Sequence, residues 1–413
     1  MAAGRRARAA WRAPSARRAP SPGDPSPGDP FDVGPYAPLR RAARLPSPVE
    51  GAAWRRALAG IAVAWAPLLL LSTLGGVALR PGHPRESFLL DVSAHARYLV
   101  ALPLLLAAEP WCVPRLAEIA RHFAAAGLVA PADRERFRAL VASARVMLRR
   151  RGVEVLLVAA AYAGTVVLRG ILYPRGVPTW VAPDAPAGLS PAGWWRALVS
   201  QPLFLLVAAV WMWRLAAWAR FLWGVSRLRL RLVSSHPDLA AGLRFAGGSL
   251  PAFAPAALAL SSALAGTMAE EILFVRGGPG ELSRVAAAAL GAAAVSLCVF
   301  AGPLLVFAGP LWRARTVGTM TYGALAGRVG RRFERRWLRP GPVRRGGRFD
   351  ESDFSATADL YAVAAGARRV GLLPAGVAEV APLVLAALLP FVPIAFLVLP
   401  VDELLGRLAG LLL

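Results

Sequence analysis

Long uninterrupted runs of apolar residues limit what this chain can fold into more than any other feature of its sequence. Several runs reach about twenty residues, the length that a helix needs to cross a hydrocarbon core of roughly 30 Å. Hydrophobic residues make up 56% of the 413 residues, and the mean hydropathy is +0.50. A water-soluble chain of this length would show interrupted periodic patterns instead. The sequence therefore predicts an all-α, polytopic helical membrane protein with about seven transmembrane helices and additional cytoplasmic amphipathic helices.

Composition divides the chain into four parts. Residues 1–57 are rich in Arg and Pro, cannot bury a core, and are expected to form a disordered cytoplasmic arm. Residues 58–312 are predicted to form a membrane domain with six spans, and residues 313–380 a cytoplasmic amphipathic segment. Residues 381–413 are predicted to hold the seventh span and a short outer C-terminal helix. The seven predicted spans are 58–79, 97–114, 153–173, 202–223, 250–270, 285–312 and 381–400.

The distribution of the basic residues predicts how these spans are oriented. All 48 basic residues are Arg, and with a cytoplasmic N-terminus 37 of them fall in cytoplasmic segments. Eight fall on the outer side, and three, Arg169, Arg214 and Arg220, fall within spans. The cytoplasmic loops of membrane proteins carry the excess of Arg and Lys. We therefore expect a multi-pass protein of the cell inner (cytoplasmic) membrane, with the N-terminus in the cytoplasm and the C-terminus outside.

Two cytoplasmic segments have an arginine-rich face and an apolar face. Residues 115–152 and 315–339 are predicted to form amphipathic helices that lie at the membrane surface. Together with the arginines of the N-terminal arm, they could contact anionic lipid headgroups. Membrane lipids are therefore the expected partner. A protein partner and the oligomeric state are left open, and no nucleic-acid partner is expected.

Missing residue types exclude several classes of chemistry. The chain has no Lys, which removes Schiff-base cofactors and P-loop nucleotide binding. It also lacks the C-x-x-C and H-E-x-x-H spacings. The sequence therefore predicts no metal site, no cofactor and no catalytic residue. We expect a non-enzymatic role, in membrane organisation or in the binding of a partner or of lipid.

Ionisable side chains inside the predicted spans are candidates for function, because a charge within the bilayer is costly. Glu109 in the second span and Arg214 in the fourth lie at a similar depth, since these two spans run in the same direction. The pair has two interpretations, a packing clamp between helices or a relay for a proton or solute. The relay would make the chain a secondary transporter or channel, which is the alternative function.

A second polar pair precedes the membrane-crossing part of the second span on its outer side. Asp91 and His95 are four residues apart and share one helix face. They could bind a metal ion or sense pH. Two ligands do not make a metal site, however, and a solvated pair is the simpler interpretation.

The stretch RLRLVSSHPDLAAGLRF contains His236, Pro237 and Asp238, the tripeptide of J-domain co-chaperones. Only 26 residues separate the fourth and fifth predicted spans, which is too few for the J-domain fold. The co-chaperone interpretation therefore fails, and we expect a turn instead. Pro237 suits the first position of a new helix, and Asp238 would lie at the positive end of its dipole.

Three patches of the chain resemble an uncharacterised family of bacterial polytopic inner-membrane proteins with an HPD-x-x-GGL-like loop motif. They are HPDLAAGLRF (236–245), FLLDVSAHARYLVALPLLLAAEP (88–110) and LPVDELLGRL (399–408). The sequence departs from the family pattern at Ala241, where the family often has a Gly. The resemblance implies a fold type and an inner-membrane location, and it supplies no catalytic residue.

Overall fold

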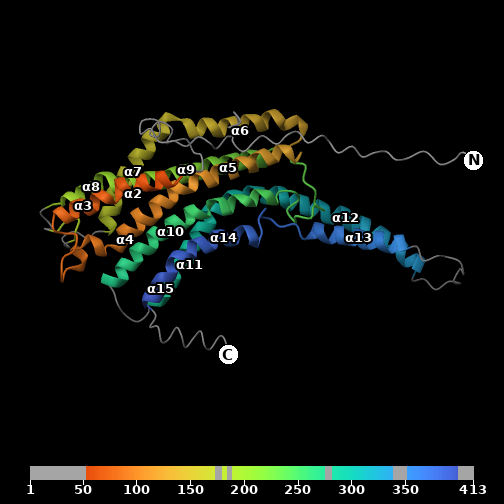
Figure 1. Cartoon of the computed structure of the whole chain (residues 1–413). Helices are drawn as coiled ribbons and strands as arrows, with labels where there is room; N and C mark the ends of the chain where they lie inside the picture. The colour runs from red at the N-terminus through yellow and green to blue at the C-terminus, as the bar shows by residue number, and fades with distance from the viewer. Residues whose placement is uncertain (1–52, 173–178, 184–187, 275–280, 338–350, 399–413) are drawn as a thin grey trace, which may run out of the picture.

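The fold is all-helical, as the apolar runs predict. The structure is a computed structural model, and it describes residues 53–172, 179–183, 188–274, 281–337 and 351–398. Seven helices within these ranges are long and apolar enough to cross a membrane, and the predicted all-α polytopic fold is confirmed (Figure 1). They are Ala53–Leu74, Val92–Ala125, Gly152–Gly170, Pro191–Ser226, Arg244–Phe274, Glu281–Arg335 and Val377–Val398.

Most of the long helices consist of shorter segments that follow one another without a loop. The first half of the chain contains α2 (Ala53–Ala64), α3 (Ala66–Leu74), η2 (Pro84–Glu86), η3 (Phe88–Leu90), α4 (Val92–His95), η4 (Ala96–Ala101), α5 (Leu102–Ala125), η5 (Pro131–Asp133), α6 (Arg134–Arg149) and α7 (Arg151–Leu172). The second half contains α8 (Pro191–Trp195), η6 (Arg196–Ser200), α9 (Gln201–Ser226), η7 (Arg244–Gly248), α10 (Ser249–Phe274), α11 (Glu281–Ala301), η8 (Gly302–Phe307), α12 (Ala308–Trp337), α13 (Glu351–Arg368), α14 (Val377–Leu388), η9 (Leu389–Phe391) and α15 (Val392–Val398). Two of these segments, η4 and η6, are π-helical.

The helix ends differ from the predicted span ends at several places. The first span begins at Ala53 rather than at residue 58. The helix of the second span runs on to Ala125, because Pro110 and Pro114 lie inside α5 without ending it. The predicted disordered arm is described only from Ala53, and the predicted C-terminal helix lies outside the described residues.

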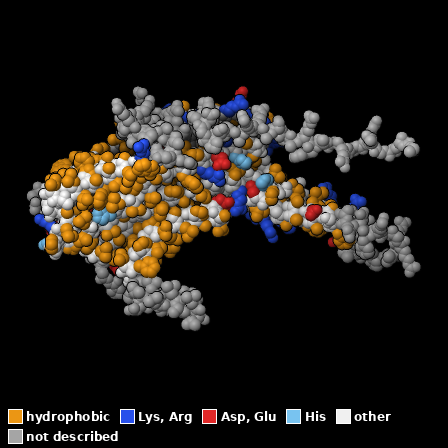
Figure 2. All heavy atoms as spheres, in the orientation of Figure 1, with side chains coloured by type: hydrophobic (Ala, Val, Ile, Leu, Met, Phe, Trp, Pro, Cys, Tyr) orange, Lys and Arg blue, Asp and Glu red, His pale blue; other side chains and the backbone are white. Residues whose placement is uncertain are grey.

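The surface of the bundle is largely apolar. On the face drawn in Figure 2, hydrophobic side chains cover most of the bundle, and charged side chains gather where the bundle meets the pair of helices α12 and α13. Some of the most exposed apolar residues are Leu74, Val166 and Val377, at 77%, 73% and 84% exposure. Such exposure would be unfavourable in water and is expected of a surface that faces lipid.

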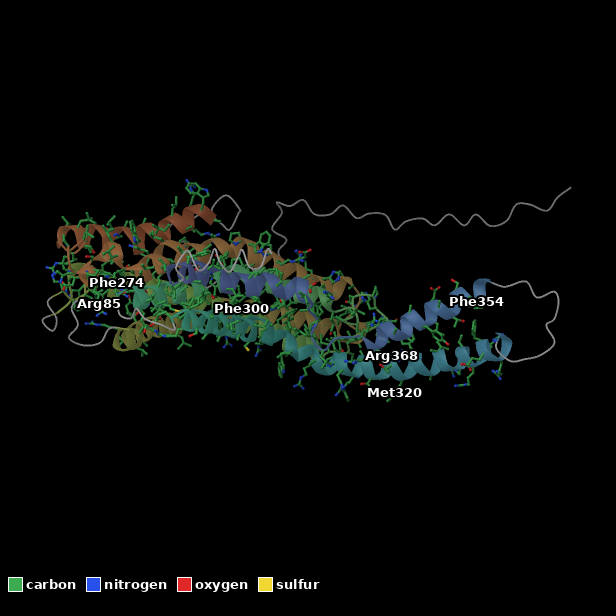
Figure 3. All side chains as sticks on the ribbon, turned by 90° about the horizontal axis from the view of Figure 1, so that it is seen from below. Arg85, Phe274, Phe300, Met320, Phe354 and Arg368 are labelled. Atoms are coloured by element: carbon green, nitrogen blue, oxygen red, sulfur yellow. The ribbon has the colours of Figure 1, made fainter. Side chains whose placement is uncertain are left out.

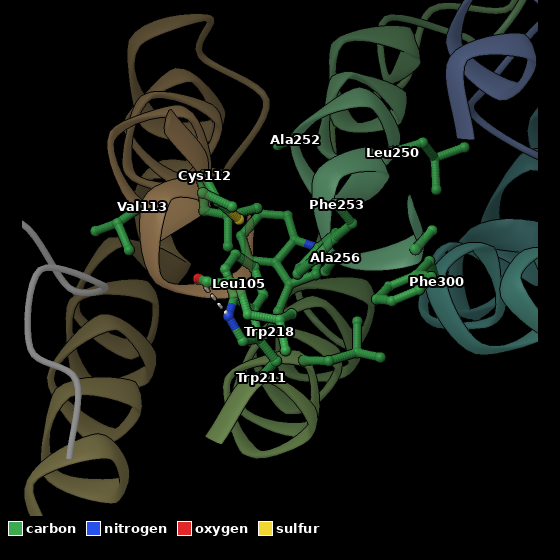
Figure 4. Close-up of a cluster of buried hydrophobic side chains, with 14 of the residues drawn as sticks. Leu105, Cys112, Val113, Trp211, Trp218, Leu250, Ala252, Phe253, Ala256 and Phe300 are labelled. Atoms are coloured by element: carbon green, nitrogen blue, oxygen red, sulfur yellow. Dashed lines mark hydrogen bonds between the residues drawn. The ribbon is translucent and has the colours of Figure 1, made fainter. Parts of the chain in front are cut away.

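Large aromatic side chains fill the centre of the bundle (Figure 4). Trp211 and Trp218 of α9 and Phe253 of α10 are fully buried. Phe253 stacks on Phe300 of α11, with 5.3 Å between the ring centroids. The Trp211 indole donates a hydrogen bond to the Leu105 carbonyl at 3.0 Å, so that its polar atom is satisfied. This core fixes α5, α9, α10 and α11 relative to one another.

A second aromatic cluster lies where α5, α6 and α9 come together. Phe123 of α5 contacts Phe245 and Phe307, at centroid distances of 4.8 and 6.0 Å. Phe137 of α6 contacts Phe221 of α9 at 6.0 Å. The segment 115–152, predicted to lie on the membrane surface, is thus divided between the second half of α5 and α6. Its apolar face packs on protein, and α9 supplies the partner that the sequence pattern alone does not identify.

Helix α12 runs on from the sixth span instead of turning to lie across the bundle. It pairs with α13, and this hairpin projects away from the bundle, as the positions of Met320, Phe354 and Arg368 show (Figures 1 and 3). Phe333 of α12 contacts Phe354 of α13 edge to face, with centroids 4.8 Å apart. α12 therefore packs on α13, although apolar side chains such as Val317 and Met320 stay exposed, at 64% and 70%.

Candidate functional site

The predicted partners Glu109 and Arg214 are in direct contact. The Nη2 atom of Arg214 donates to Oε1 of Glu109 at 2.6 Å. A third residue, Arg56, donates from Nη1 to Oε2 of the same carboxylate at 2.7 Å. The side chains of Arg56 and Arg214 are 7% and 2% exposed. One carboxylate thus joins α2, α5 and α9 through two buried guanidinium groups.

The surroundings of this triad favour a fixed ion cluster. The guanidinium of Arg214 lies over the Trp211 ring, 4.8 Å from its centroid, which adds a cation–π contact. Both oxygens of Glu109 are engaged by guanidinium donors. Sequence reasoning missed Arg56, because it began the first span at residue 58 and assigned Arg56 to the cytoplasmic arm. The helix begins five residues earlier and carries Arg56 into the bundle.

Asp91 and His95 do not act as a pair. Asp91 is buried, caps α4 by accepting from the Ala94 N–H, and accepts from the Trp180 indole at 2.7 Å. His95 Nδ1 accepts from the Trp65 indole at 3.0 Å. The predicted solvated pair is therefore wrong for Asp91, because residues distant in sequence cover it. No group of three His, Cys, Asp or Glu side chains among the described residues could hold a metal ion.

The His236-Pro237-Asp238 stretch forms a tight turn, but the helix predicted to begin at Pro237 is absent. The next helix, η7, begins at Arg244. Leu239 and Ala241 have φ angles of 56° and 54°, in the left-handed region that side chains disfavour. Ala241, the position at which the family pattern has Gly, thus adopts a conformation that suits Gly better.

The Asp238 carboxylate holds this strained turn together. It accepts from the backbone N–H groups of Ala240, Gly242 and Arg244 at 2.9, 3.0 and 3.1 Å. Burial raises the pKa of this carboxyl group, but the three backbone hydrogen bonds and the contact with His236 outweigh burial and hold the pKa below its usual value of 3.8. The residues of the motif therefore serve the shape of the turn.

A pocket lies between α6, α7 and α9. It has a volume of about 290 Å³, and its polar lining consists of Ser143, Arg150, Trp213 and Arg220. We call it the Arg150–Arg220 pocket. The Arg220 Nη2 atom lies 3.4 Å from Ser143 Oγ. The indole N–H of Trp213 is buried and has no acceptor among the described residues. The pocket thus combines two arginines with a free hydrogen-bond donor.

The position of the Arg150–Arg220 pocket is set by the junction between α6 and α7. Arg150 separates the two helices, and the apolar span of α7 begins at Gly152. Trp213 is adjacent to Arg214, the α9 member of the triad, and Arg56 of the triad lies in the first turns of α2. The pocket and the triad therefore share one turn of α9 and lie next to each other.

Comparison with known proteins finds no matching family model, no similar curated protein and no similar solved structure. The resemblance to the HPD-loop membrane family thus remains an expectation from three short patches.

Proposed function

We propose that this chain is a non-enzymatic integral membrane protein that binds anionic phospholipid headgroups in the Arg150–Arg220 pocket. The observation that carries the proposal is the Trp213 indole N–H, which is buried at the pocket without an acceptor. A buried donor left without a partner costs free energy, and a bound acceptor would remove that cost. A headgroup phosphate supplies the acceptor oxygens, and its charge matches the two arginines.

The apolar surface around the pocket supports a lipid over a soluble anion. Val146 and Val153 belong to the lining of the pocket, and Val155 and Leu156 of α7 are 72% and 63% exposed close by. Acyl chains could follow this face of α7 while the phosphate lies between the arginines. Basic pockets between transmembrane helices bind anionic headgroups in this way on the cytoplasmic side. With the predicted orientation, the pocket opens to the inner leaflet of the inner membrane.

The proposal is tested by measuring which lipids remain on the purified protein. The protein is released from nanodiscs of mixed phosphatidylglycerol and phosphatidylcholine and weighed by native mass spectrometry. We expect the wild type to retain phosphatidylglycerol preferentially. The double variant Arg150→Gln/Arg220→Gln should lose this preference, because the two glutamine side chains carry no positive charge to bind the phosphate.

A matched control removes two arginines elsewhere. Arg328 and Arg332 are exposed on α12, away from the pocket, so that Arg328→Gln/Arg332→Gln lowers the net charge equally. This control should retain phosphatidylglycerol as the wild type does. Equal retention of both lipids by the wild type, or equal losses in the two double variants, would contradict a specific headgroup site.

A further inference from the structure

A second cavity with arginines in its lining lies at the other end of α7. Its volume is about 70 Å³, and it is enclosed by α7, the segment before α8, and the π-helices η4 and η6. Its polar lining residues are Arg97, Thr165, Arg169, Thr179, Arg196 and Gln201. The α7 helix has 22 residues, so that its two ends are about 33 Å apart at 1.5 Å per residue. We call this the Arg97 cavity.

Arg97 is the most informative residue of this cavity. It is only 5% exposed, and its Nη2 atom donates to Ser93 Oγ at 2.6 Å and to Thr267 Oγ1 at 2.9 Å. Both acceptors are neutral hydroxyl groups. The Nη1 atom is buried and has no partner, and no carboxylate within the described ranges forms an ion pair with this guanidinium. This buried guanidinium therefore has no counter-ion in direct contact, and one of its N–H donors has no acceptor.

Two π-helical segments bring the arginines to the cavity. Arg97 lies in η4, and Arg196 is the first residue of η6. The Tyr98 hydroxyl of η4 donates to Oε1 of Gln201, which directly follows η6, at 2.9 Å. Arg196 is 5% exposed and lies over the Trp180 ring, 5.4 Å from its centroid. Single turns of π-helix inside α-helices occur frequently at functional sites, and here both π-helices contribute to one cavity.

Two carboxyl groups among the described residues, Asp91 and Glu270, lie near these arginines. Asp91 gives its two oxygens to the Ala94 N–H and the Trp180 indole. Glu270 of α10 interacts electrostatically with Asp91, Arg97 and Arg196. Arg169 adds a third positive charge at the exposed rim of the cavity. Among the described residues, three guanidinium groups and two carboxyl groups therefore lie at or beside this cavity, and these five groups together carry a net positive charge.

We infer that the Arg97 cavity binds an oxyanion, the carboxylate or phosphate group of a small amphiphilic ligand. The volume suits a group of this size, since a water molecule needs roughly 10–15 Å³ by the same measure. Much of the remaining lining is apolar, including Leu168, Val181 and Leu189, which suits an apolar body attached to the anion. Such an oxyanion could belong to a soluble molecule or to a lipid headgroup.

The test for a soluble ligand uses the full chain in phosphatidylcholine nanodiscs and isothermal titration calorimetry. The probes are butyrate, inorganic phosphate and, as an uncharged counterpart of butyrate, 1-butanol. We expect butyrate or phosphate to bind and 1-butanol not to bind. The variant Arg169→Gln should weaken binding about tenfold, the effect of losing one charge-assisted hydrogen bond. Arg169 is exposed, so that this variant leaves the core intact.

Arg284→Gln is the charge-matched control. Arg284 pairs with Glu281 in the first turn of α11 and does not line the cavity. The Arg284→Gln variant should bind butyrate and phosphate with the same affinity as the wild type. The lipid source is tested in the Arg150→Gln/Arg220→Gln background, which removes the other pocket. If phosphatidylglycerol nanodiscs stabilise this protein relative to phosphatidylcholine nanodiscs, and if Arg169→Gln abolishes that stabilisation, the oxyanion belongs to a lipid headgroup.

Three results would overturn the inference. The first is equal binding of 1-butanol and butyrate, which would show an apolar void. The second is unchanged affinity in Arg169→Gln. The third is the absence of any response to butyrate, to phosphate and to phosphatidylglycerol. None of these outcomes bears on the Arg150–Arg220 pocket, so that the two proposals succeed or fail separately.

Discussion

Glu109 neutralises two buried arginines at once, and this determines what its replacement does. Changing Glu109 to Gln leaves Arg56 and Arg214 without a counter-charge in a buried position. Removing one partner of a buried ion pair costs about 3–5 kcal/mol. We therefore expect Glu109→Gln to lower the free energy of unfolding by about 3 kcal/mol, measured by denaturation in detergent micelles.

Glu118→Gln on the same helix is the matched control for this prediction. Glu118 pairs with Arg115, but both side chains are exposed, at 61% and 50%. Its loss should cost less than about 1 kcal/mol. If Glu109 is instead a relay, as in the transporter alternative, Glu109→Gln should fold almost as stably as the wild type. It would then abolish proton-coupled flux in proteoliposomes, and that combination would contradict the clamp.

The lowered pKa of Asp238 gives its turn a defined pH dependence. A carboxyl group whose pKa is lower in the folded state than in the unfolded state adds stability above its unfolded pKa, and this stability is lost as the pH falls through the folded pKa. The melting temperature of Asp238→Asn should thus lie below that of the wild type at pH 5 and above. The gap should shrink as the pH falls below 3.8, the usual value for Asp.

Asp359→Asn on α13 controls for the general effect of removing a carboxylate. Asp359 is exposed, and the melting temperature of this variant should equal that of the wild type across the same pH range. A gap for Asp238→Asn that stays constant or widens toward pH 3 would show that the carboxylate does not stabilise the turn through its charge.

Residue contacts were predictable from sequence only where depth in the bundle decided them. Glu109 and Arg214 lie on spans that run in the same direction, so that their similar depth indicated a contact. The partners of Asp91 and His95 are Trp180 and Trp65, which are brought in by loops and helices distant in sequence. No spacing rule within one helix can identify such partners, because only the tertiary fold places them.

Helices were predictable as apolar runs, but their irregular segments were not. The sixth predicted span is interrupted by a 3-10 segment, η8, that begins at Gly302 and has Pro303 in its first turn. The π-helices η4 and η6 carry no comparable signal in sequence. They accompany the packing of Tyr98 against Gln201 and the close approach of α10, which are tertiary features.

The approach of α10 to η4 depends on a Gly. A methyl group added at Gly266 would overlap with the side chain of Ala96 at the start of η4, and would also meet the Val92 carbonyl at 3.3 Å. Overpacking of this kind costs about 1–3 kcal/mol. We expect Gly266→Ala to lower the free energy of unfolding by that amount. It should also weaken ligand binding at the Arg97 cavity, because Thr267 would shift.

Gly291→Ala on α11 provides the contrast. Gly291 is exposed, and nothing lies within 4 Å of an added methyl group. Because Ala favours a helix over Gly by about 1 kcal/mol, this variant should be as stable as the wild type or slightly more stable. Similar destabilisation in both variants, measured by thermal unfolding, would show that the helix–helix contact at Gly266 is not close.

At the scale of the whole molecule, arginines mark both ends of α7. On α7, Val153 lines the Arg150–Arg220 pocket, and Thr165, Leu168 and Arg169 line the Arg97 cavity, so that the two sites are about 18 to 24 Å apart along the helix axis. This separation is smaller than the thickness of a hydrocarbon core of roughly 30 Å, and it places the two sites at different depths along α7. Their chemistry is the same, and they differ in what can reach them from each side.

The predicted orientation follows from the odd number of spans and the arginine distribution. If each of the seven candidate helices in the described ranges crosses once, the two termini lie on opposite sides, and 37 of the 48 arginines favour a cytoplasmic N-terminus. A green fluorescent protein fused before Met1 should fluoresce in bacterial cells, and alkaline phosphatase fused after Leu413 should be active, since each reporter works on one side only. Fusions after Trp223 and Phe274, at the ends of α9 and α10, give internal controls, with fluorescence expected at the first and phosphatase activity at the second. A fluorescent C-terminal fusion would mean an even number of crossings. The predicted orientation, with the Arg150–Arg220 pocket at the inner leaflet, would then fall, although the contacts within the pocket and within the Arg97 cavity would stand.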